Sequence, residues 1–282
     1  MKKKSREFIK VLFISQEISP FVKETTRSLL GHMLPRKVQE KGGEVRIFMP
    51  SYGMINERKN QLHEVIRLSG TNIGVGNDND NPLIIKVSSI PLARMQVYFI
   101  DNEDYFVDRL MLADEKGNFY KDNDERAIFF TKGVLETVKK MRWVPDIIHI
   151  SGWISHLFPL YVKYVYKDEP YFQNAKVVYS LYNETFDGEL NKKYKDKLKS
   201  DDIPGSVLKI LNPPNYLNSI KLALNFSDGV SFVEDNIDDE IVKYIKKLKL
   251  PSLGVVNVDQ EDYVERYLNF YKELLPQKYV EV

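Results

Sequence analysis

Two charged side chains, Glu17 and Lys23, follow the first apolar run of the chain, KVLFIS (residues 10–15). They lie in SQEISPFVKETT (15–26), between a predicted buried strand and a predicted helix. In open α/β proteins ligands bind at the carboxyl ends of strands, and the free N–H groups of a helix start favour an anion. The pattern therefore predicts a ligand site at Glu17 and Lys23, although two ordinary surface charges would produce the same sequence.

A second turn of this kind carries Ser151, Gly152 and Trp153, in PDIIHISGWISHLF (145–158). It is predicted to join a strand to a helix, so it lies where an α/β protein binds ligands. Serine and glycine nevertheless supply no obvious acid, base or metal ligand. The turn marks a site by its position and argues against catalysis by its content.

The histidines and glycines give no sign of a metal or a resident cofactor. The four histidines have neither HxxxH nor HExxH spacing, and His149 lies inside a predicted strand, where a hydrogen-bonded structural role is the commoner outcome. No GxGxxG or GxxxxGK[ST] loop follows a strand. We therefore expect no metal site and no cofactor.

The composition is that of a globular protein, since 43% of the 282 residues are hydrophobic and 29% are charged. With 41 basic and 40 acidic residues the net charge is +1, which argues against a nucleic-acid partner. The chain has no cysteine and no stretch of about eighteen apolar residues that would span a membrane. The apolar run after MKKKSREFIK is too short for a signal-peptide core, so we expect a cytoplasmic protein without a membrane partner.

Strands and helices that alternate along most of the chain must position these residues. Apolar, β-rich runs predict strands at 10–15, 44–50, 62–68, 83–90, 95–101, 146–150, 176–182, 229–234 and 253–258. Helices are predicted at 25–41, where Pro35 breaks the helix or starts its second half, and at 124–141, 153–166, 216–226, 238–249 and 261–275. This order predicts one α/β domain over residues 1–282, a Rossmann-like, doubly wound, mostly parallel sheet with helices on both faces.

Seven segments, in the same order, resemble the N-terminal half of bacterial glycogen synthases and plant starch synthases. They are KVLFISQEISPFVK, GGEVRIFMPSYG, VYFIDNEDYF, DNDERAIFF, WVPDIIHISGW, KVVYSLYN and LNFSDGVSFVEDN. The family's opening segment usually has the form KVLFVSSEVAPFAKTGGL. The resemblance implies an ADP-glucose-dependent glucosyltransferase of the GT-B arrangement, in which two Rossmann-like domains enclose the reaction cleft.

The resemblance also implies roles for retained residues. Lys23 would lie near the donor phosphates, Glu17 and Asp122 would line the acceptor side, and Asn183 is a further retained position. The implied ligand is a glucan or ADP-glucose, and the implied partner is a full-length synthase or another protein of glycogen metabolism. Because the likeness stops near residue 258, we expect the second GT-B domain to be absent and residues 261–275 to form a helix that packs back on the first.

Three departures from the family pattern count against catalysis. The family's Thr-Gly-Gly after the lysine is Glu24-Thr25-Thr26 here, its His-Asp before tryptophan is Ser151-Gly152, and its Ile-His-Asn is Leu181-Tyr182-Asn183. Small residues that let the backbone approach the nucleotide are lost, and so is a histidine that would support the transferred sugar. We predict no catalytic residue. The candidate ligand-binding residues are Glu17, Lys23, Asp122, Ser151, Gly152, Trp153 and Asn183.

Three hypotheses follow from these observations. The first is a glycogen/starch-synthase-like protein that is catalytically impaired or inactive alone, a pseudoenzyme that binds glucan or serves as an accessory protein. The second is an active ADP-glucose-dependent α-1,4-glucosyltransferase completed by a partner chain. The third is a flavodoxin-like interaction module with no sugar role. A glucose-transfer assay separates the first two, and glycogen co-sedimentation separates the first from the third.

Overall fold

The computed structural model describes residues 8–90 and 95–276. Its strands are β1 Lys10–Ser15, β2 Glu44–Pro50, β3 His63–Glu64, β4 Thr71–Asn72, β5 Pro82–Ile90, β6 Met95–Asp101, β7 Ile147–Ser151, β8 Lys176–Leu181, β9 Gly229–Phe232 and β10 Ser252–Leu253. Its helices are α1 Thr26–Glu40, α2 Asn123–Lys140, α3 Phe158–Leu160, α4 Tyr194–Lys199, α5 Tyr216–Phe226, α6 Asp239–Leu248 and α7 Tyr263–Leu274. Short 3₁₀ or π-helical turns occupy Trp153–Ser155, Tyr161–Val165 and Val207–Ile210.

The strands follow the order β10-β9-β8-β7-β1-β2-β6-β5-β3, with β4 paired to β5. From β10 to β6 all neighbours are parallel, whereas β5 runs antiparallel to β6, and β3 and β4 run antiparallel to β5. The chain winds outward from β1 in both directions, so the order reverses between β1 and β7. Such a reversal opens the crevice in which α/β proteins bind ligands.

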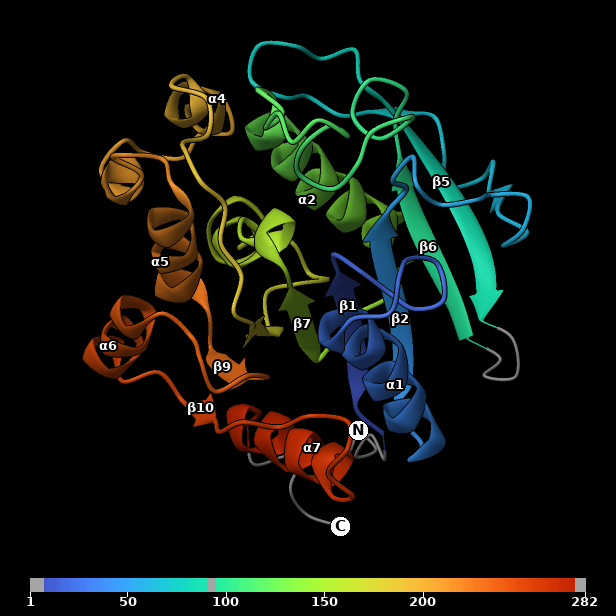
Figure 1. Cartoon of the computed structure of the whole chain (residues 1–282), viewed down its shortest axis with the longest axis vertical. Helices are drawn as coiled ribbons and strands as arrows, with labels where there is room; N and C mark the ends of the chain where they lie inside the picture. The colour runs from blue at the N-terminus through green and yellow to red at the C-terminus, as the bar shows by residue number, and fades with distance from the viewer. Residues whose placement is uncertain (1–7, 91–94, 277–282) are drawn as a thin grey trace.

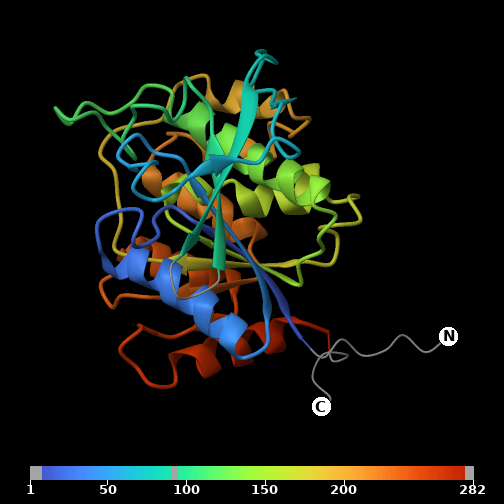
Figure 2. The same ribbon diagram turned by 90° about the vertical axis from the view of Figure 1, so that its right-hand side faces the viewer.

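Helices cover both faces of this sheet (Figures 1 and 2). Helices α1 and α7 contact each other on one face, while α2, α3 and α5 lie on the other. Because both faces are covered, the central strands β1, β7 and β8 are buried almost throughout. The predicted doubly wound, mostly parallel α/β fold is confirmed. Within residues 8–90 and 95–276, no helix is long and apolar enough to cross a membrane.

A buried polar chain ties α7 to the centre of the sheet. His149 of β7 is hydrogen-bonded through Nδ1 to the Tyr271 hydroxyl and through Nε2 to Ser180 Oγ, at 2.6 Å. Ser180 continues to Ser231 at 2.6 Å, and the Tyr267 hydroxyl donates to Ser231 at 3.4 Å. Burial lowers the pKa of His149 to about 3, so the ring is neutral. His149 therefore has the structural role that its strand position predicted.

Several predicted elements differ in extent. Helix α1 runs unbroken through Pro35, because proline removes only one helical hydrogen bond while the flanking Leu34 and Val38 are buried in the core. The predicted helix 153–166 is a series of short turns, and Pro159 contributes to this because it has no N–H to donate to the preceding turn. The predicted strands 62–68 and 253–258 shorten to β3 and β10, both at the periphery of the sheet.

Candidate functional site

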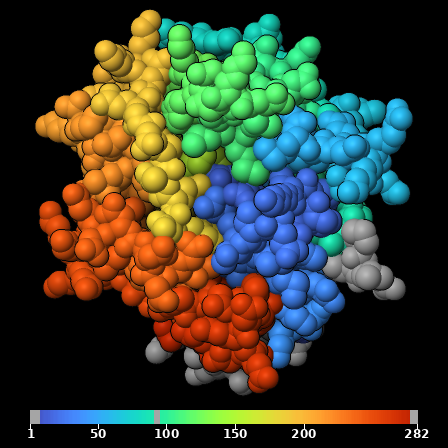
Figure 3. All heavy atoms as spheres, in the orientation of Figure 1, coloured from blue at the N-terminus to red at the C-terminus, as the bar shows by residue number. Residues whose placement is uncertain are grey.

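The loops after β1, β7 and β8 adjoin at the carboxyl edge of the sheet. Ser15 pairs with Ser151, and Ser151 pairs with Ser180, in parallel register. Figure 3 shows the blue segment after β1, the yellow segment after β8 and the green segment near residue 110 side by side on one face. The predicted residues Glu17, Ser151–Trp153 and Asn183 therefore belong to one edge, as parallel strand pairing requires.

At the centre of this edge, one arginine bridges two carboxylates. Arg27 Nη1 lies 2.6 Å from Glu17 Oε1 and 3.0 Å from Glu184 Oε1. Gln16 Nε2 donates to Glu184 Oε1 at 3.0 Å and to Glu17 Oε1 at 3.4 Å. The guanidinium also lies 4.9 Å from the centre of the Tyr182 ring. We refer to Gln16, Glu17, Arg27 and Glu184 as the Arg27 network.

Burial and charge act in opposite directions on this network. Burial raises the pKa of Glu184, against the lowering effects of Arg27, of Gln16 and of the Trp153 backbone N–H. Burial also disfavours the Arg27 cation, but Glu184 and Glu17 outweigh it and raise the pKa of Arg27. Arg27 is therefore a fixed cation whose charge is already matched within the chain.

The start of α1, where the resemblance places the donor phosphates, is occupied by threonines. Thr25 is the N-cap, and its hydroxyl accepts from the Ser28 N–H at 3.0 Å while it donates to Glu17 Oε2 at 3.0 Å. Lys23 is exposed, and its carbonyl accepts from the Ser28 hydroxyl at 3.1 Å. The helix start is thus capped by its own residues and faces the Glu17 carboxylate.

The Ser151-Gly152 turn fits closely against Gln16. Gly152 has φ +87°, and a Cβ there would lie 2.4 Å from Gln16 Cβ, so a side chain would clash as well as strain the backbone. The Ser151 carbonyl accepts from the Gln16 N–H at 3.2 Å. At position 16 the family has serine and this chain has glutamine, and at position 152 the family has aspartate and this chain has glycine. The Gln16 side chain fills the space that Gly152 leaves.

Trp153 and Asn183 flank the network. Trp153 is 2% exposed and packs edge-on against Phe186, with ring centres 5.9 Å apart. The exposed Asn183 donates its backbone N–H to Glu234 Oε2 at 2.7 Å. Trp153 is therefore a buried packing residue beneath the carboxyl edge, whereas Asn183 lies on the protein surface at this edge.

Asp122 is paired with Arg109, whereas Glu17 is paired with Arg27. Both carboxylate oxygens of Asp122 bind Arg109, at 2.5 and 2.9 Å, and the Arg109 guanidinium stacks 4.3 Å from the Tyr120 ring centre. The Asn191 side chain donates to the Lys121 carbonyl at 3.4 Å, which brings the loop after β8 beside Asp122. The ligand-binding roles assigned from the sequence to these residues stay predictions.

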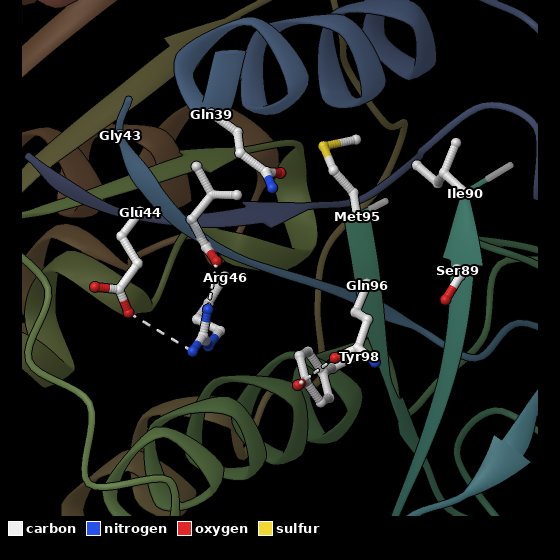
Figure 4. A pocket seen from close by; sticks show the side chains of 10 residues that line it. Gln39, Gly43, Glu44, Arg46, Ser89, Ile90, Met95, Gln96 and Tyr98 are labelled. Carbon is white, nitrogen blue, oxygen red and sulfur yellow. Dashed lines mark hydrogen bonds and ion pairs between the residues drawn. The ribbon is translucent and has the colours of Figure 1, made fainter. Parts of the chain in front are cut away.

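Cavities lie at both edges of the sheet. One of about 700 Å³ is lined by Gln39, Glu44, Arg46, Gln96 and Tyr98 among others, at the amino ends of β2 and β6 (Figure 4). This is the edge opposite the predicted site, and none of the predicted residues lines it. Two grooves lie at the carboxyl edge: one of about 360 Å³ beside Tyr194 and Asn212, and one of about 380 Å³ between Thr26 and Glu234.

No group of three or more histidine or carboxylate side chains suited to a metal ion occurs within residues 8–90 and 95–276. His156, the other fully buried histidine, contacts the Trp153 carbonyl through Nδ1 and the Tyr194 hydroxyl through Nε2, both at 2.6 Å. Burial lowers its pKa to about 4, which makes it a neutral packing residue.

The sequence reasoning missed Gln16, Arg27 and Glu184. One signal was available for Arg27, which is a cation in the first turn of a helix, where acidic residues are favoured and cations are not. Gln16 and Glu184 carry no such signal, because their importance depends on which loops meet in space.

An open, mostly parallel α/β sheet with a polar cluster at the carboxyl edge of its reversal point defines a Rossmann-like domain of the type that forms one half of a GT-B glycosyltransferase. The family model of the starch synthase catalytic domain matches residues 10–252. The chain belongs to this family, and the resemblance seen in the sequence is confirmed.

Relatives support this assignment and define its extent. The chain is 39% identical over 214 residues to the glycogen synthase of Chlorobium luteolum, covering 76% of this chain and 44% of that protein. It is 37% identical over 239 residues to the glycogen synthase of Pelodictyon phaeoclathratiforme, covering 84% and 48%. The chain therefore spans about half the length of these relatives.

A solved structure shares the fold. The catalytic domain of starch synthase IV from Arabidopsis thaliana, bound to ADP and acarbose, superposes with a TM-score of 0.68 at 17% identity. The match covers 89% of this chain and 52% of that one. The likeness shows that the two chains share the fold of one GT-B half.

Proposed function

We propose that this chain is a synthase-type protein of α-glucan metabolism that holds a glucan at the carboxyl edge and does not by itself transfer glucose from ADP-glucose. The observation that carries this proposal is the Arg27 network, in which the edge's buried cation is bound by two carboxylates of the chain. Glucosyl transfer requires unmatched positive charge or donors aimed at the departing diphosphate.

The residues around the Arg27 network also support a chain that does not transfer glucose by itself. Tyr182 occupies a position where the family has histidine, and burial raises its pKa well above the ordinary tyrosine value, so its hydroxyl is not a base near neutral pH. Ser151 replaces a second histidine and Gly152 an aspartate. Removal of one positioned donor typically lowers a rate by about 100-fold or more, and several supports are changed together here.

The groove beside Tyr194 and Asn212 is our candidate for the glucan. Its volume is about 360 Å³, and it is joined to the segment before Asp122 through the Asn191 side chain. Its lining mixes amide, ammonium, carboxylate and proline groups, which suits hydroxyl-rich ligands that need several hydrogen bonds and a small apolar contact. A glucan in this groove would lie next to Asp122, the residue that the resemblance assigns to the acceptor side.

A direct assay tests the proposal. The purified chain is incubated with radiolabelled ADP-glucose and a glycogen primer, and separately sedimented with glycogen. We expect no incorporation above a protein-free blank and retention of the chain in the glycogen pellet. Incorporation by the purified chain would refute the inactive assignment, and its absence from the pellet would refute glucan binding and favour the interaction module.

A second candidate function has one specific observation in its favour. The curated relatives extend over more than twice the aligned part, so a glucosyltransferase completed by a donor-binding partner chain remains consistent with the family. Addition of a candidate partner to the same assay distinguishes it, since activity would then appear only in the mixture.

A further inference from the structure

The Arg27 network resembles an occupied anion site in which the anion is part of the chain. One nitrogen, Arg27 Nη1, contacts both Glu17 at 2.6 Å and Glu184 at 3.0 Å. The side chains of Arg27, Glu17 and Glu184 are only 15%, 9% and 12% exposed. One cation and two carboxylates leave a formal charge of −1, at a place where a diphosphate would need a positive one.

Glu184 is the carboxylate that substitutes for a ligand. Glu17 lies on the same loop–helix unit as Arg27 and is also held by the Thr25 hydroxyl. Glu184 comes instead from the loop after β8 and reaches across to α1, supported by Gln16. A bound anion that used Arg27 would have to compete with Glu184 for the same guanidinium.

The neighbouring groove adds negative charge. Glu234, Asp235 and Asp259 line the groove of about 380 Å³ that borders the start of α1. Glu234 is linked to Asn183, the residue before Glu184. Lys23, on the loop that leads into α1, makes no ion pair within the described part of the chain and is exposed to solvent. An exposed lysine binds an anion weakly because water and salt screen its charge.

We infer that Glu184 is a specificity-determining residue: its carboxylate occupies Arg27 in place of a ligand anion, so the carboxyl edge rejects nucleoside diphosphates and admits only uncharged saccharide. The second half of this inference rests on the proposed glucan-binding function, whereas the rejection of diphosphates does not. Displacing a charge-assisted hydrogen bond of this kind weakens anion binding by ~10- to 100-fold.

The test is calorimetric titration of the intact chain with ADP. We expect no measurable heat of binding for the wild type at roughly millimolar ADP. For Glu184→Gln we expect a measurable heat, with an affinity at least about 10-fold above the detection limit that bounds the wild type. The glutamine keeps the size of the side chain and removes its charge. Glu184→Ala, which removes the side chain, should show the same gain and provides a second variant if the first does not fold, as judged by a cooperative thermal transition.

Two controls isolate the mechanism. Glu169→Gln makes the same change in net charge at a carboxylate paired with Lys139 at 2.9 Å, away from the edge, and should leave ADP binding undetectable. The double variant Glu184→Gln/Arg27→Met should lose the gain, because the freed cation is gone. ADP binding by the wild type, an equal gain with Glu169→Gln, or a gain that persists without Arg27 would each overturn the inference.

Glycogen co-sedimentation of the same preparations separates the two proposals. If Glu184→Gln gains ADP binding while no variant is retained by glycogen, the rejection of diphosphates stands and the glucan-binding function fails. If all variants are retained by glycogen and ADP binding does not depend on Glu184, the function stands and this inference fails.

Discussion

Within residues 8–90 and 95–276, Arg126 and Arg27 are both shielded from solvent to a large degree, but their partners differ in kind. Arg126, at the start of α2, is fully buried and donates to the carbonyls of Tyr105, Leu110 and Met111 and to the Asn123 side chain. Arg27, at the start of α1, binds two carboxylates instead. Burial lowers the pKa of Arg126 to about 10, whereas the carboxylates raise that of Arg27.

This difference distinguishes a residue with a structural role from one at the predicted ligand site. Arg126 belongs to DNDERAIFF, a segment that resembles the family, and it holds the loop after β6 in place. Arg27 stands where the family's opening segment has leucine, within the stretch that departs from the pattern. Several departures gather at the carboxyl edge and contact one another: Gln16 lies against Gly152, and the Arg27 guanidinium lies over the Tyr182 ring.

Replacement of Arg126 should have the largest effect on stability. Arg126→Met leaves one buried and two partly buried carbonyls without their donor, so we expect the free energy of unfolding to fall by about 4 kcal/mol. Because carbonyls do not titrate, this loss should be the same at pH 7 and pH 5. Urea unfolding measures it, and Arg36→Met, which breaks an exposed pair with Glu40, should change stability by less than about 1 kcal/mol.

Replacement of Arg27 should cost somewhat less, and the cost should depend on pH. Arg27→Met leaves Glu17 and Glu184 buried without a cation, which we expect to lower the free energy of unfolding by about 3 kcal/mol at pH 7. Burial already raises the pKa of Glu184, and loss of the Arg27 cation raises it further above the unfolded value. Protonation of Glu184 therefore stabilises the folded variant as the pH falls, and the cost should at least halve by pH 5. Equal pH dependence of the Arg126 and Arg27 variants would contradict the comparison.

The Arg27 network also depends on the close fit of Gln16 against Gly152, whereas the hydrogen bonds of Arg126 involve neither residue. Gly152→Ala should destabilise the protein by about 2 kcal/mol, since it adds strain at φ +87° and a clash with Gln16. Gly188→Ala is a matched control, because Gly188 has φ +95° and nothing within 4 Å of an added Cβ. It should cost about half as much, from strain alone. An equal cost at the two glycines, measured by urea unfolding, would show that Gln16 moves aside freely.

The smallest expected effect is the pH dependence of the wild type, against which both arginine variants are measured. His149 and His156 have folded-state pKa values of about 3 and 4, below the ordinary histidine value. Their stabilising contribution is present above the unfolded pKa and is lost as the pH falls below it, toward those folded values.

Raised carboxyl pKa values offset part of this loss. Burial raises the pKa of Glu184, Asp101 and Asp124, and each of these groups favours the folded state more as the pH falls. We expect a net loss of about 1 to 2 kcal/mol between pH 7 and pH 5, measured by urea unfolding at each pH. A wild-type stability that rises over this range would contradict the neutral assignment of both histidines.

The sequence predicted the fold better than it predicted the contents of the site. Strands β1 and β2 begin and end at the residues that their apolar runs indicated, because a strand buried on both faces reads as a continuous apolar segment. The short strands β3 and β10 were predicted too long, since edge pairing depends on neighbours that a local pattern does not contain. The break predicted at Pro35 is absent for the same reason, because packing of the neighbouring residues in the core keeps helix α1 continuous.

By itself, the sequence determined the family, the doubly wound sheet and the edge at which its loops meet, because these depend on periodicity and on the order of strands and helices. Only the tertiary structure decided what occupies that edge. Gln16, Arg27 and Glu184 lie on two loops and a helix separated by up to 168 residues, and register pairing of β1, β7 and β8 brings them within hydrogen-bonding distance. Ion pairs and close packing depend on ångström separations, and no local pattern of residue types encodes those separations.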